Sequence, residues 1–375
     1  MQNPPKDLDL KKTVETVLEI HLPNLLDNFQ TLRSKVNEKT KILAVVKAVA
    51  YGTDAMAVAK CLELAGVDYF AVAYVSEGVA LRKAGITKPI LVLHPQIGNL
   101  KKAIQYDLEP SMYSFRILRA FAALLEEKKI AQYPIHIKFN TGLNRLGFTV
   151  NDIELLLKEI NTPFLTVVSI FSHLAASEDV KEKAFTQKQI EKFKAISKQF
   201  DDRPMRHLVN TSGILNFPEA HFDMVRTGIG LYGYGNDPVF DSLFKPVAQL
   251  KTVISQIHTL KKGESLGYNR AFVANKTTRT ATLPLGHADG IGRHYGNEKG
   301  VVYVNSHPAK IIGNVCMDML MIDVTDIDCH EGDEVVIFGE KHQSAEMFAK
   351  KAQTISYEIL TAISHRIKRK FIVKP

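Results

Sequence analysis

A repeated alternation of short apolar runs with longer helical patterns, from residue 14 to about residue 235, constrains the fold of this chain more than any other feature. The apolar runs are rich in β-branched residues, as buried strands are. Candidate strands lie at residues 17–20, 42–46, 69–73, 90–93, 135–139, 167–171 and 208–209. Strands that alternate with helices form parallel sheets, and this many units at this length predict an α/β fold, a closed (β/α)8 barrel of the TIM type.

The pattern changes beyond Lys245. Short β-branched segments follow one another and are separated by turns rich in glycine, aspartate and asparagine, which predicts a mainly antiparallel β domain. The turn at 235–238 marks the boundary. We therefore expect a linker-like tail at residues 1–13, a barrel domain at 14–240 and a β domain at 241–375.

Composition and charge exclude several classes of protein. With 45% hydrophobic and 23% charged residues, the chain has the profile of a globular protein, and no apolar run approaches the ~20 residues that span a bilayer. The N-terminus is polar, so we expect a cytoplasmic protein without membrane contact. Its three cysteines form no CxxC pair and indicate neither disulfides nor a metal site. The net charge of +8 favours anionic ligands, but the basic segment at 366–370 lacks stacking aromatic residues and does not predict a nucleic-acid partner.

Lys47 ends the apolar run at residues 43–46. A buried strand that stops at a cation would place Lys47 where a barrel opens into its ligand site. Desolvation lowers the pKa of an amine and leaves part of it as a free nucleophile, the condition for imine formation with pyridoxal phosphate or a carbonyl substrate. The alternative is a lysine at a strand end that reaches into solvent.

Two segments after later strands carry further candidate site residues. A polar, glycine-containing turn after the strand at 135–139 holds Arg145, whose guanidinium can clamp a carboxylate or cap a helix. His173 follows the strand at 167–171, at the barrel face where catalytic groups collect. A lone histidine in that place can equally be structural.

A third segment combines hydroxyl groups with glycines. Residues 210–212 read Asn-Thr-Ser, and residues 225–233 read VRTGIGLYG. Unhindered backbone N–H groups at the ends of late barrel strands can point at phosphate oxygens, and Arg226, just before the glycines, can reach a pyridine nitrogen. Taken alone, a glycine-rich turn is a weak signal.

The order of these motifs resembles the alanine racemases. The segment KAVAYG at residues 47–52 looks like the pyridoxal phosphate lysine signature of that family. Counterparts of the later family motifs follow in order: KFNTGLNRLGF (138–148), SHLAASED (172–179), NTSGIL (210–215), VRTGIGLYG (225–233), LGYNRAF (266–272), LPLGHADGIGR (283–293), GNVCMDMLMIDV (313–324) and TISYEIL (354–360). The resemblance covers residues 14 to about 370.

The resemblance implies a fold-type III enzyme that interconverts L- and D-alanine and supplies D-alanine for peptidoglycan. Its cofactor is pyridoxal 5'-phosphate, and its quaternary structure is a head-to-tail homodimer with each active site between a barrel and the partner's β domain. Lys47 would form the imine and act on one face of the substrate α-carbon. Tyr268 of the partner subunit would serve the opposite face.

The resemblance also assigns the remaining site residues. Tyr51, Ser212, Gly228, Ile229 and Tyr357 would hold the phosphate. Arg226 would face the pyridine nitrogen, with His173 near the ring. Arg145 and the Met317 backbone would hold the substrate carboxylate, and Lys138 matches a position that is carbamylated in some members.

Three positions depart from the family pattern. Val49 stands beside the lysine where Asn or Asp is usual, Asn140 replaces the Asp of DTG, and His287 replaces a tyrosine that lines the substrate entry. His287 leaves a broad-specificity or serine racemase as an alternative. A fold-type III decarboxylase is a second alternative, although such enzymes place an acid opposite the pyridine nitrogen where this chain has Arg226. A non-catalytic single-barrel pyridoxal phosphate carrier would lack the second domain.

Overall fold

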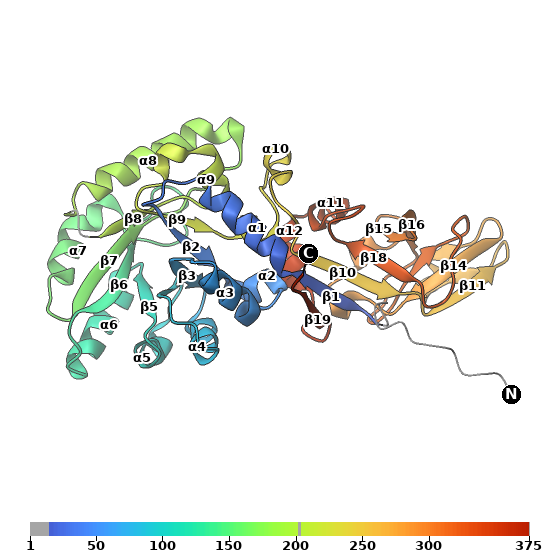
Figure 1. Ribbon diagram of the computed structural model, residues 1–375, viewed down its shortest axis with the longest axis horizontal. Coiled ribbons are helices and arrows are strands. Elements are labelled where there is room, and N and C mark those ends of the chain that lie inside the picture. The colour runs from blue at the N-terminus through green and yellow to red at the C-terminus, as the bar shows by residue number, and fades with distance from the viewer. Residues whose placement is uncertain (1–14, 202–203, 375) are drawn as a thin grey trace. The chain divides into compact units, whose positions relative to one another are not determined.

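The computed structural model describes residues 15–201 and 204–374 (Figure 1). The described chain divides into two compact units. One runs from Leu25 to Lys245, and the other joins the segment before Leu25 to the residues from Pro246 onward.

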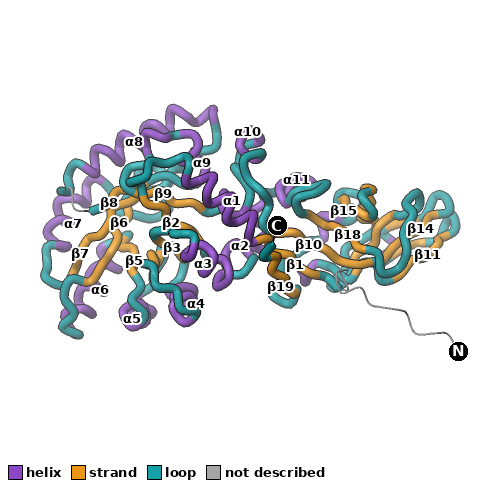
Figure 2. The backbone as a smooth tube through the Cα atoms, in the orientation of Figure 1, coloured by secondary structure: helices purple, strands orange, loops and turns teal. Residues whose placement is uncertain are grey.

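The first unit is a nearly closed barrel of eight parallel strands surrounded by helices (Figure 2). The strands are β2 (Lys41–Val45), β3 (Tyr69–Val72), β4 (Ile90–Val92), β5 (Glu109–Met112), β6 (Tyr133–Lys138), β7 (Leu165–Phe171), β8 (Met205–His207) and β9 (Met224–Thr227). Neighbours pair in the order β8-β7-β6-β5-β4-β3-β2-β9. At the two ends of this order, the amide of Arg226 in β9 donates to the carbonyl of Val209, which lies just after β8, at 3.1 Å. The predicted (β/α)8 barrel is thus confirmed.

Helices cover the outside of this barrel, as the alternating sequence pattern predicts. They are α1 (Leu22–Arg33), α3 (Ala55–Leu64), α4 (Val75–Lys83), α5 (Leu100–Gln105), α6 (Phe115–Glu127), α7 (Ile153–Ile160), α8 (Lys183–Ser197), α9 (Thr211–Asn216) and α10 (Pro238–Asp241). In α6, Ile117, Phe121 and Leu125 recur on one face and are buried. That spacing is the amphipathic period of a helix packed on a core.

The second unit is built on a mainly antiparallel sheet, as predicted. Its nine strands follow the order β11-β14-β17-β16-β15-β18-β10-β1-β19. Their bounds are β1 (Val17–His21), β10 (Ala248–Val253), β11 (Gln256–Leu260), β14 (Thr278–Leu283), β15 (Val301–Val304), β16 (His307–Ile312), β17 (Leu320–Asp323), β18 (Glu334–Phe338) and β19 (Lys368–Ile372). A two-stranded sheet of β12 (Ser265–Leu266) and β13 (Phe272–Val273) and two helices, α11 (Ala345–Lys351) and α12 (Ser356–Ala362), complete the unit.

Strand β1 belongs to this second sheet, although it precedes the barrel in the chain. It pairs with β10 in antiparallel fashion and with β19 in parallel. Glu19 in β1 forms ion pairs with Lys251 and Lys370, both at 3.1 Å. A strand is therefore present at the predicted position 17–20, but its pairing partners are outside the barrel.

The helices of the described residues include none with the length and apolar character needed to cross a bilayer.

Candidate active site

The predicted site residues of the first unit gather where its strands end. Lys47 follows β2, Lys138 is the last residue of β6, and His173 follows β7. Arg226 lies in β9 and Ser212 in α9. Because parallel strands end on one side of a barrel, these side chains converge at its carboxyl-terminal face.

Lys47 opens a left-handed turn. The element α2 (Lys47–Gly52) contains four consecutive residues from Ala48 to Tyr51 with φ between 51° and 55°. This conformation costs roughly 1–2 kcal/mol for each non-glycine residue. The Glu77 carboxylate stabilises the start of the turn because it accepts hydrogen bonds from the backbone N–H groups of Ala48, at 2.6 Å, and Ala73, at 2.7 Å. Burial, and then the positive charge of Arg145, lower the pKa of the Lys47 amine below its ordinary value.

Lys138 is buried next to other cations. Its pKa is lowered to about 8, mainly by burial and further by the charges of Arg145, Arg226 and Lys47. Its ammonium lies 5.7 Å from the centroid of the Phe171 ring, and no acidic side chain of the described residues forms an ion pair with it. Lys47, Lys138, Arg145 and Arg226 thus form a cluster of positive charge. Such a cluster is suited to anionic ligands.

Arg226 is 4% exposed and is held by uncharged acceptors. Its Nη2 donates to the Ser172 carbonyl at 2.6 Å and the Leu208 carbonyl at 2.7 Å, and lies 3.1 Å from His173 Nδ1. Its Nη1 donates to His207 Nδ1 at 2.8 Å. Burial lowers the Arg226 pKa to about 9. Burial and the charge of Arg226 hold the pKa of His173 well below its ordinary value, so this imidazole is neutral.

A small cradle lies beside these groups. The Thr211 hydroxyl accepts hydrogen bonds from the N–H groups of Gly228, at 3.3 Å, and Gly230, at 3.2 Å. A Cβ atom at Gly228 would lie 2.2 Å from the Tyr51 hydroxyl, so only glycine leaves room for this tyrosine. Ser212 is 1% exposed, and its hydroxyl accepts a hydrogen bond from Asn236 Nδ2 at 3.1 Å.

Ile229 begins the short 3₁₀ helix η5 (Ile229–Tyr232), which follows Gly228 directly. The structure thus brings together Tyr51, Gly228 and Ile229, three of the residues predicted to hold a phosphate. Hydroxyls, glycines and nearby cations together are suited to a phosphate group.

The other predicted site residues belong to the second unit. Tyr268 opens the 3₁₀ helix η6 (Tyr268–Arg270) and is 72% exposed. Met317 is exposed, and its carbonyl accepts a hydrogen bond from the Ala288 amide at 3.0 Å, next to His287. The carbonyl of Tyr268 accepts a hydrogen bond from Asn314 Nδ2 at 3.1 Å. Tyr357 is half-buried in α12.

His207 is a site residue that sequence reasoning missed. It is fully buried at the end of β8 and contacts Arg226 directly. The sequence feature that could have indicated His207 is its position directly before the apolar strand predicted at 208–209, where a histidine would be buried. A polar residue in such a place needs a partner.

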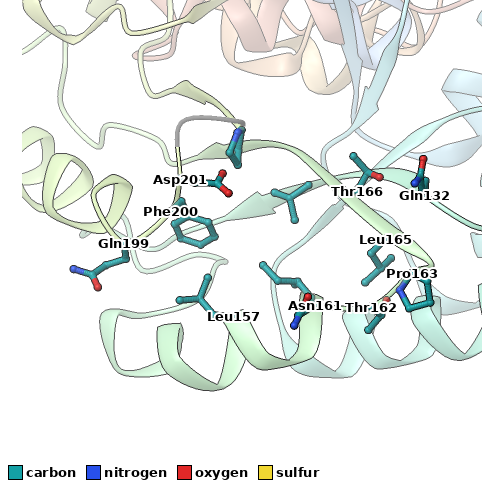
Figure 3. Close-up of a pocket in the computed structure, with 13 residues that line it drawn as sticks. Gln132, Leu157, Asn161, Thr162, Pro163, Leu165, Thr166, Gln199, Phe200 and Asp201 are labelled. Atoms are coloured by element: carbon teal, nitrogen blue, oxygen red, sulfur yellow. The ribbon is translucent and has the colours of Figure 1, made fainter.

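A cavity of about 590 Å³ lies at the other end of the barrel, beside the amino-terminal ends of β6, β7 and β8 (Figure 3). Its lining includes Gln132, Leu157, Leu165 and Phe200, and it contains none of the predicted site residues. Among the described residues, no group of three or more histidine, cysteine or acidic side chains is placed to hold a metal ion.

Comparisons with known proteins show the family of the chain. The model of the alanine racemase N-terminal domain matches residues 20–236, and that of the C-terminal domain matches residues 247–371. Alanine racemase 2 of Caldanaerobacter subterraneus subsp. tengcongensis is 36% identical, over 96% of this chain and 95% of its own length.

Solved structures give the same result. An alanine racemase of Clostridium difficile 630 matches with a TM-score of 0.90 and 33% identity, covering 96% of this chain and 97% of its own. An alanine racemase from Bartonella henselae with covalently bound pyridoxal phosphate matches with a TM-score of 0.88 and 30% identity, covering 96% of this chain and all of its own. Both domain models match this chain, and a curated alanine racemase is 36% identical to it over nearly its whole length. The chain therefore belongs to the alanine racemase family.

Proposed function

We propose that the protein interconverts L-alanine and D-alanine with pyridoxal 5'-phosphate as its cofactor, and so supplies D-alanine for peptidoglycan in the cytoplasm. The observation that carries this proposal is Lys47, an amine with a lowered pKa at the carboxyl-terminal face of a barrel and beside a cradle suited to phosphate. Racemisation of alanine by this chain follows from its family and from this site together.

The residues present fit the cofactor. The hydroxyls of Tyr51 and Ser212 and the backbone at Gly228 and Ile229 would hold the phosphate, and Tyr357 would add its hydroxyl. When bound, pyridoxal phosphate acidifies the α-hydrogen of the attached amino acid by delocalising the negative charge that its removal leaves. The protein provides the attachment point at Lys47 and the donor groups around it.

Two bases are needed for racemisation, because a proton must leave one face of the α-carbon and another must arrive on the opposite face. Lys47 would take or return the proton on one face, since its lowered pKa leaves part of the amine free. We propose that Tyr268 of the partner subunit acts on the other face, in a head-to-tail homodimer. The exposure of Tyr268 in the single chain is compatible with a role across an interface.

Arg226 favours racemisation over decarboxylation. A guanidinium donates hydrogen bonds and keeps its protons, so Arg226 would leave the pyridine nitrogen unprotonated and limit the delocalisation of charge. Weak delocalisation favours prompt return of the proton to the α-carbon. Neutral His173, at 3.1 Å from Arg226, adds no further charge at this position.

Arg145 and the Met317 backbone would bind the substrate carboxylate. We propose that Lys138 steadies Arg145 after carbamylation: the neutral amine attacks carbon dioxide, a nitrogen–carbon bond forms, and one proton leaves. A pKa of about 8 leaves a useful fraction of this amine uncharged near neutral pH. The resulting anion would sit near Arg145, Arg226 and Lys47, whose charges lower the pKa of this amine.

Borohydride reduction tests the central assignment. The purified protein should be yellow, and reduction should fix the pyridoxyl group on Lys47, as located by peptide mass analysis. Lys138, a buried lysine of the same cluster, serves as the internal control and should remain without a pyridoxyl group. Label on any other residue, or no cofactor absorbance after reconstitution, would contradict the assignment.

A further inference from the structure

A line of buried polar side chains crosses the interior of the barrel from Arg226 to Glu109. Its hydrogen bonds join Arg226 Nη1 to His207 Nδ1 at 2.8 Å, His207 Nε2 to Ser169 Oγ at 2.8 Å, Ser169 Oγ to His136 Nδ1 at 2.6 Å, and His136 Nε2 to Glu109 Oε2 at 2.8 Å. His136, Ser169 and His207 are 0% exposed. Barrel interiors are usually filled by layers of branched apolar side chains, so this line of polar groups requires an explanation.

The two ends determine the direction of every hydrogen bond in the line. A guanidinium can only donate and a carboxylate can only accept. His207 Nδ1 therefore accepts from Arg226, which places the proton of His207 on Nε2, where it is donated to Ser169. The Ser169 hydroxyl then donates to His136 Nδ1, and His136 Nε2–H donates to Glu109. All four hydrogen bonds point from Arg226 towards Glu109.

Other protonation states leave donors facing donors. A second proton on His207 would set an N–H against the guanidinium of Arg226. A second proton on His136 would turn the Ser169 hydroxyl towards His207 Nε2, and His207 would then need its own proton on Nδ1, again facing Arg226. Burial and the charge of Arg226 also hold the pKa of His207 well below its ordinary value. One arrangement alone satisfies all five groups.

Glu109 is the acceptor at the far end of this line. It is the first residue of β5, at the amino-terminal side of the barrel, and its side chain is 13% exposed. The direct partners of Arg226 are all uncharged. Hydrogen bonds in a chain polarise one another, so a carboxylate at one end makes His207 Nδ1 a stronger acceptor for Arg226 at the other.

We propose that Glu109, Ser169 and His136 are positioning residues that act through His207 to set how strongly Arg226 donates to the cofactor's pyridine nitrogen. This inference rests on the proposed function, in which Arg226 faces that nitrogen. A guanidinium that donates to a stronger acceptor on one side is a weaker donor on the other. The line would therefore weaken the hydrogen bond to the ring and keep charge delocalisation into it small.

The protein without cofactor gives the first test. In ¹⁵N-histidine NMR spectra, His136 and His207 should both be neutral with the proton on Nε2, with assignments from His136→Gln and His207→Gln. A charged imidazole, or a proton on Nδ1 at His207, would overturn the predicted direction of the line. This measurement does not depend on the cofactor site, so it stands even where the proposed function fails.

The holoenzyme gives the second test, with ¹⁵N in the pyridine ring of the cofactor. Ser169→Ala should move the pyridine ¹⁵N resonance towards the shielded, hydrogen-bonded side, and Glu109→Gln should move it in the same direction by less, because the amide oxygen still accepts from His136. Ser169→Thr, which retains the hydroxyl, should restore the wild-type shift.

Ser111→Ala is the matched control. Ser111 is also a fully buried barrel serine, and its hydroxyl donates to the Leu93 carbonyl at 3.0 Å, outside the line. Its loss should destabilise the protein about as much as Ser169→Ala and leave the ¹⁵N resonance unchanged. Should Ser169→Ala match this control in a holoenzyme that racemises alanine, the inference is wrong and the proposed function stands.

Discussion

Ala48→Gly should stabilise the protein, although replacing alanine by glycine in an ordinary right-handed helix is destabilising. Ala48 has φ 51° and ψ 50°, in the left-handed region where a Cβ atom is unfavourable. Its side chain is exposed, so removing the methyl group sacrifices little packing. Glycine retains the backbone N–H that donates to Glu77.

The expected magnitude follows from two opposing terms. Relief of the left-handed conformation contributes about 1–2 kcal/mol. The greater freedom of glycine in the unfolded chain costs about 0.5–1 kcal/mol. The free energy of unfolding should therefore rise by about 1 kcal/mol.

Ala123→Gly is the matched control. Ala123 is exposed and lies within the ordinary right-handed helix α6, where glycine costs about 1 kcal/mol relative to alanine. Ala48→Gly should thus be more stable than the wild type and Ala123→Gly less stable, and their free energies of unfolding should differ by about 2 kcal/mol.

Urea denaturation of the cofactor-free protein, followed by circular dichroism, measures these changes as shifts in midpoint at constant slope. If Ala48→Gly lowers the midpoint as Ala123→Gly does, the turn after Lys47 is not strained at this residue, and the reasoning is refuted.

Four further predictions concern the site. Gly228→Ala should weaken pyridoxal phosphate binding at least about tenfold, ~1.4 kcal/mol, because the new Cβ would lie 2.2 Å from the Tyr51 hydroxyl; an unchanged Kd in a fluorescence titration would exclude this clash. In buffer free of carbon dioxide, where Lys138 is not carbamylated, Lys138→Met should raise the free energy of unfolding of the cofactor-free protein at pH 7 by up to about 3 kcal/mol. Below pH 8 the folded wild type carries a buried ammonium, which destabilises it relative to the variant. This difference in stability should vanish as pH rises from about 8 to 10.5, because over that range only the unfolded chain still binds the proton. A stability gain of Lys138→Met that does not change with pH would contradict the lowered pKa. Tyr268→Phe should lose α-proton exchange mainly with one enantiomer of alanine, and equal residual exchange of both would count against two bases. His287→Tyr should raise kcat/KM for alanine relative to serine, and an unchanged ratio would remove His287 from the determinants of specificity.

The barrel was predictable because most of its strands are short apolar runs between amphipathic helices. Strands β5 and β9 were not predicted, and the strand predicted at 208–209 lies just after β8. In β5, Glu109 and Pro110 interrupt the apolar pattern, and the Glu109 carboxyl accepts a hydrogen bond from His136 instead of filling the core. The pairing of β1 was equally inaccessible. Its partners lie in β10 and β19, and local periodicity contains no information on pairing over such separations.

The site was predictable as a set of motifs but not as a geometry. Nothing in the segment from Ala48 to Tyr51 indicates a left-handed turn, because none of its residues is glycine or asparagine. His136 reads as part of an ordinary buried strand, and His207 lies just before the strand predicted at 208–209. Their role depends on which side chains meet inside the barrel, and only the strand order determines that.

The position of β1 has a consequence for the order of events during synthesis. This strand leaves the ribosome before any strand of the barrel, yet Glu19 pairs with Lys370, 351 residues later. At about 5–20 residues per second, the strand waits roughly 20–70 s for that partner. The whole barrel is made in the interval and can fold as a unit. Completion of the second sheet therefore waits until β19 has been made, and a ribosome stalled before β19 would hold a barrel whose preceding strand β1 is still open to pairing with another chain.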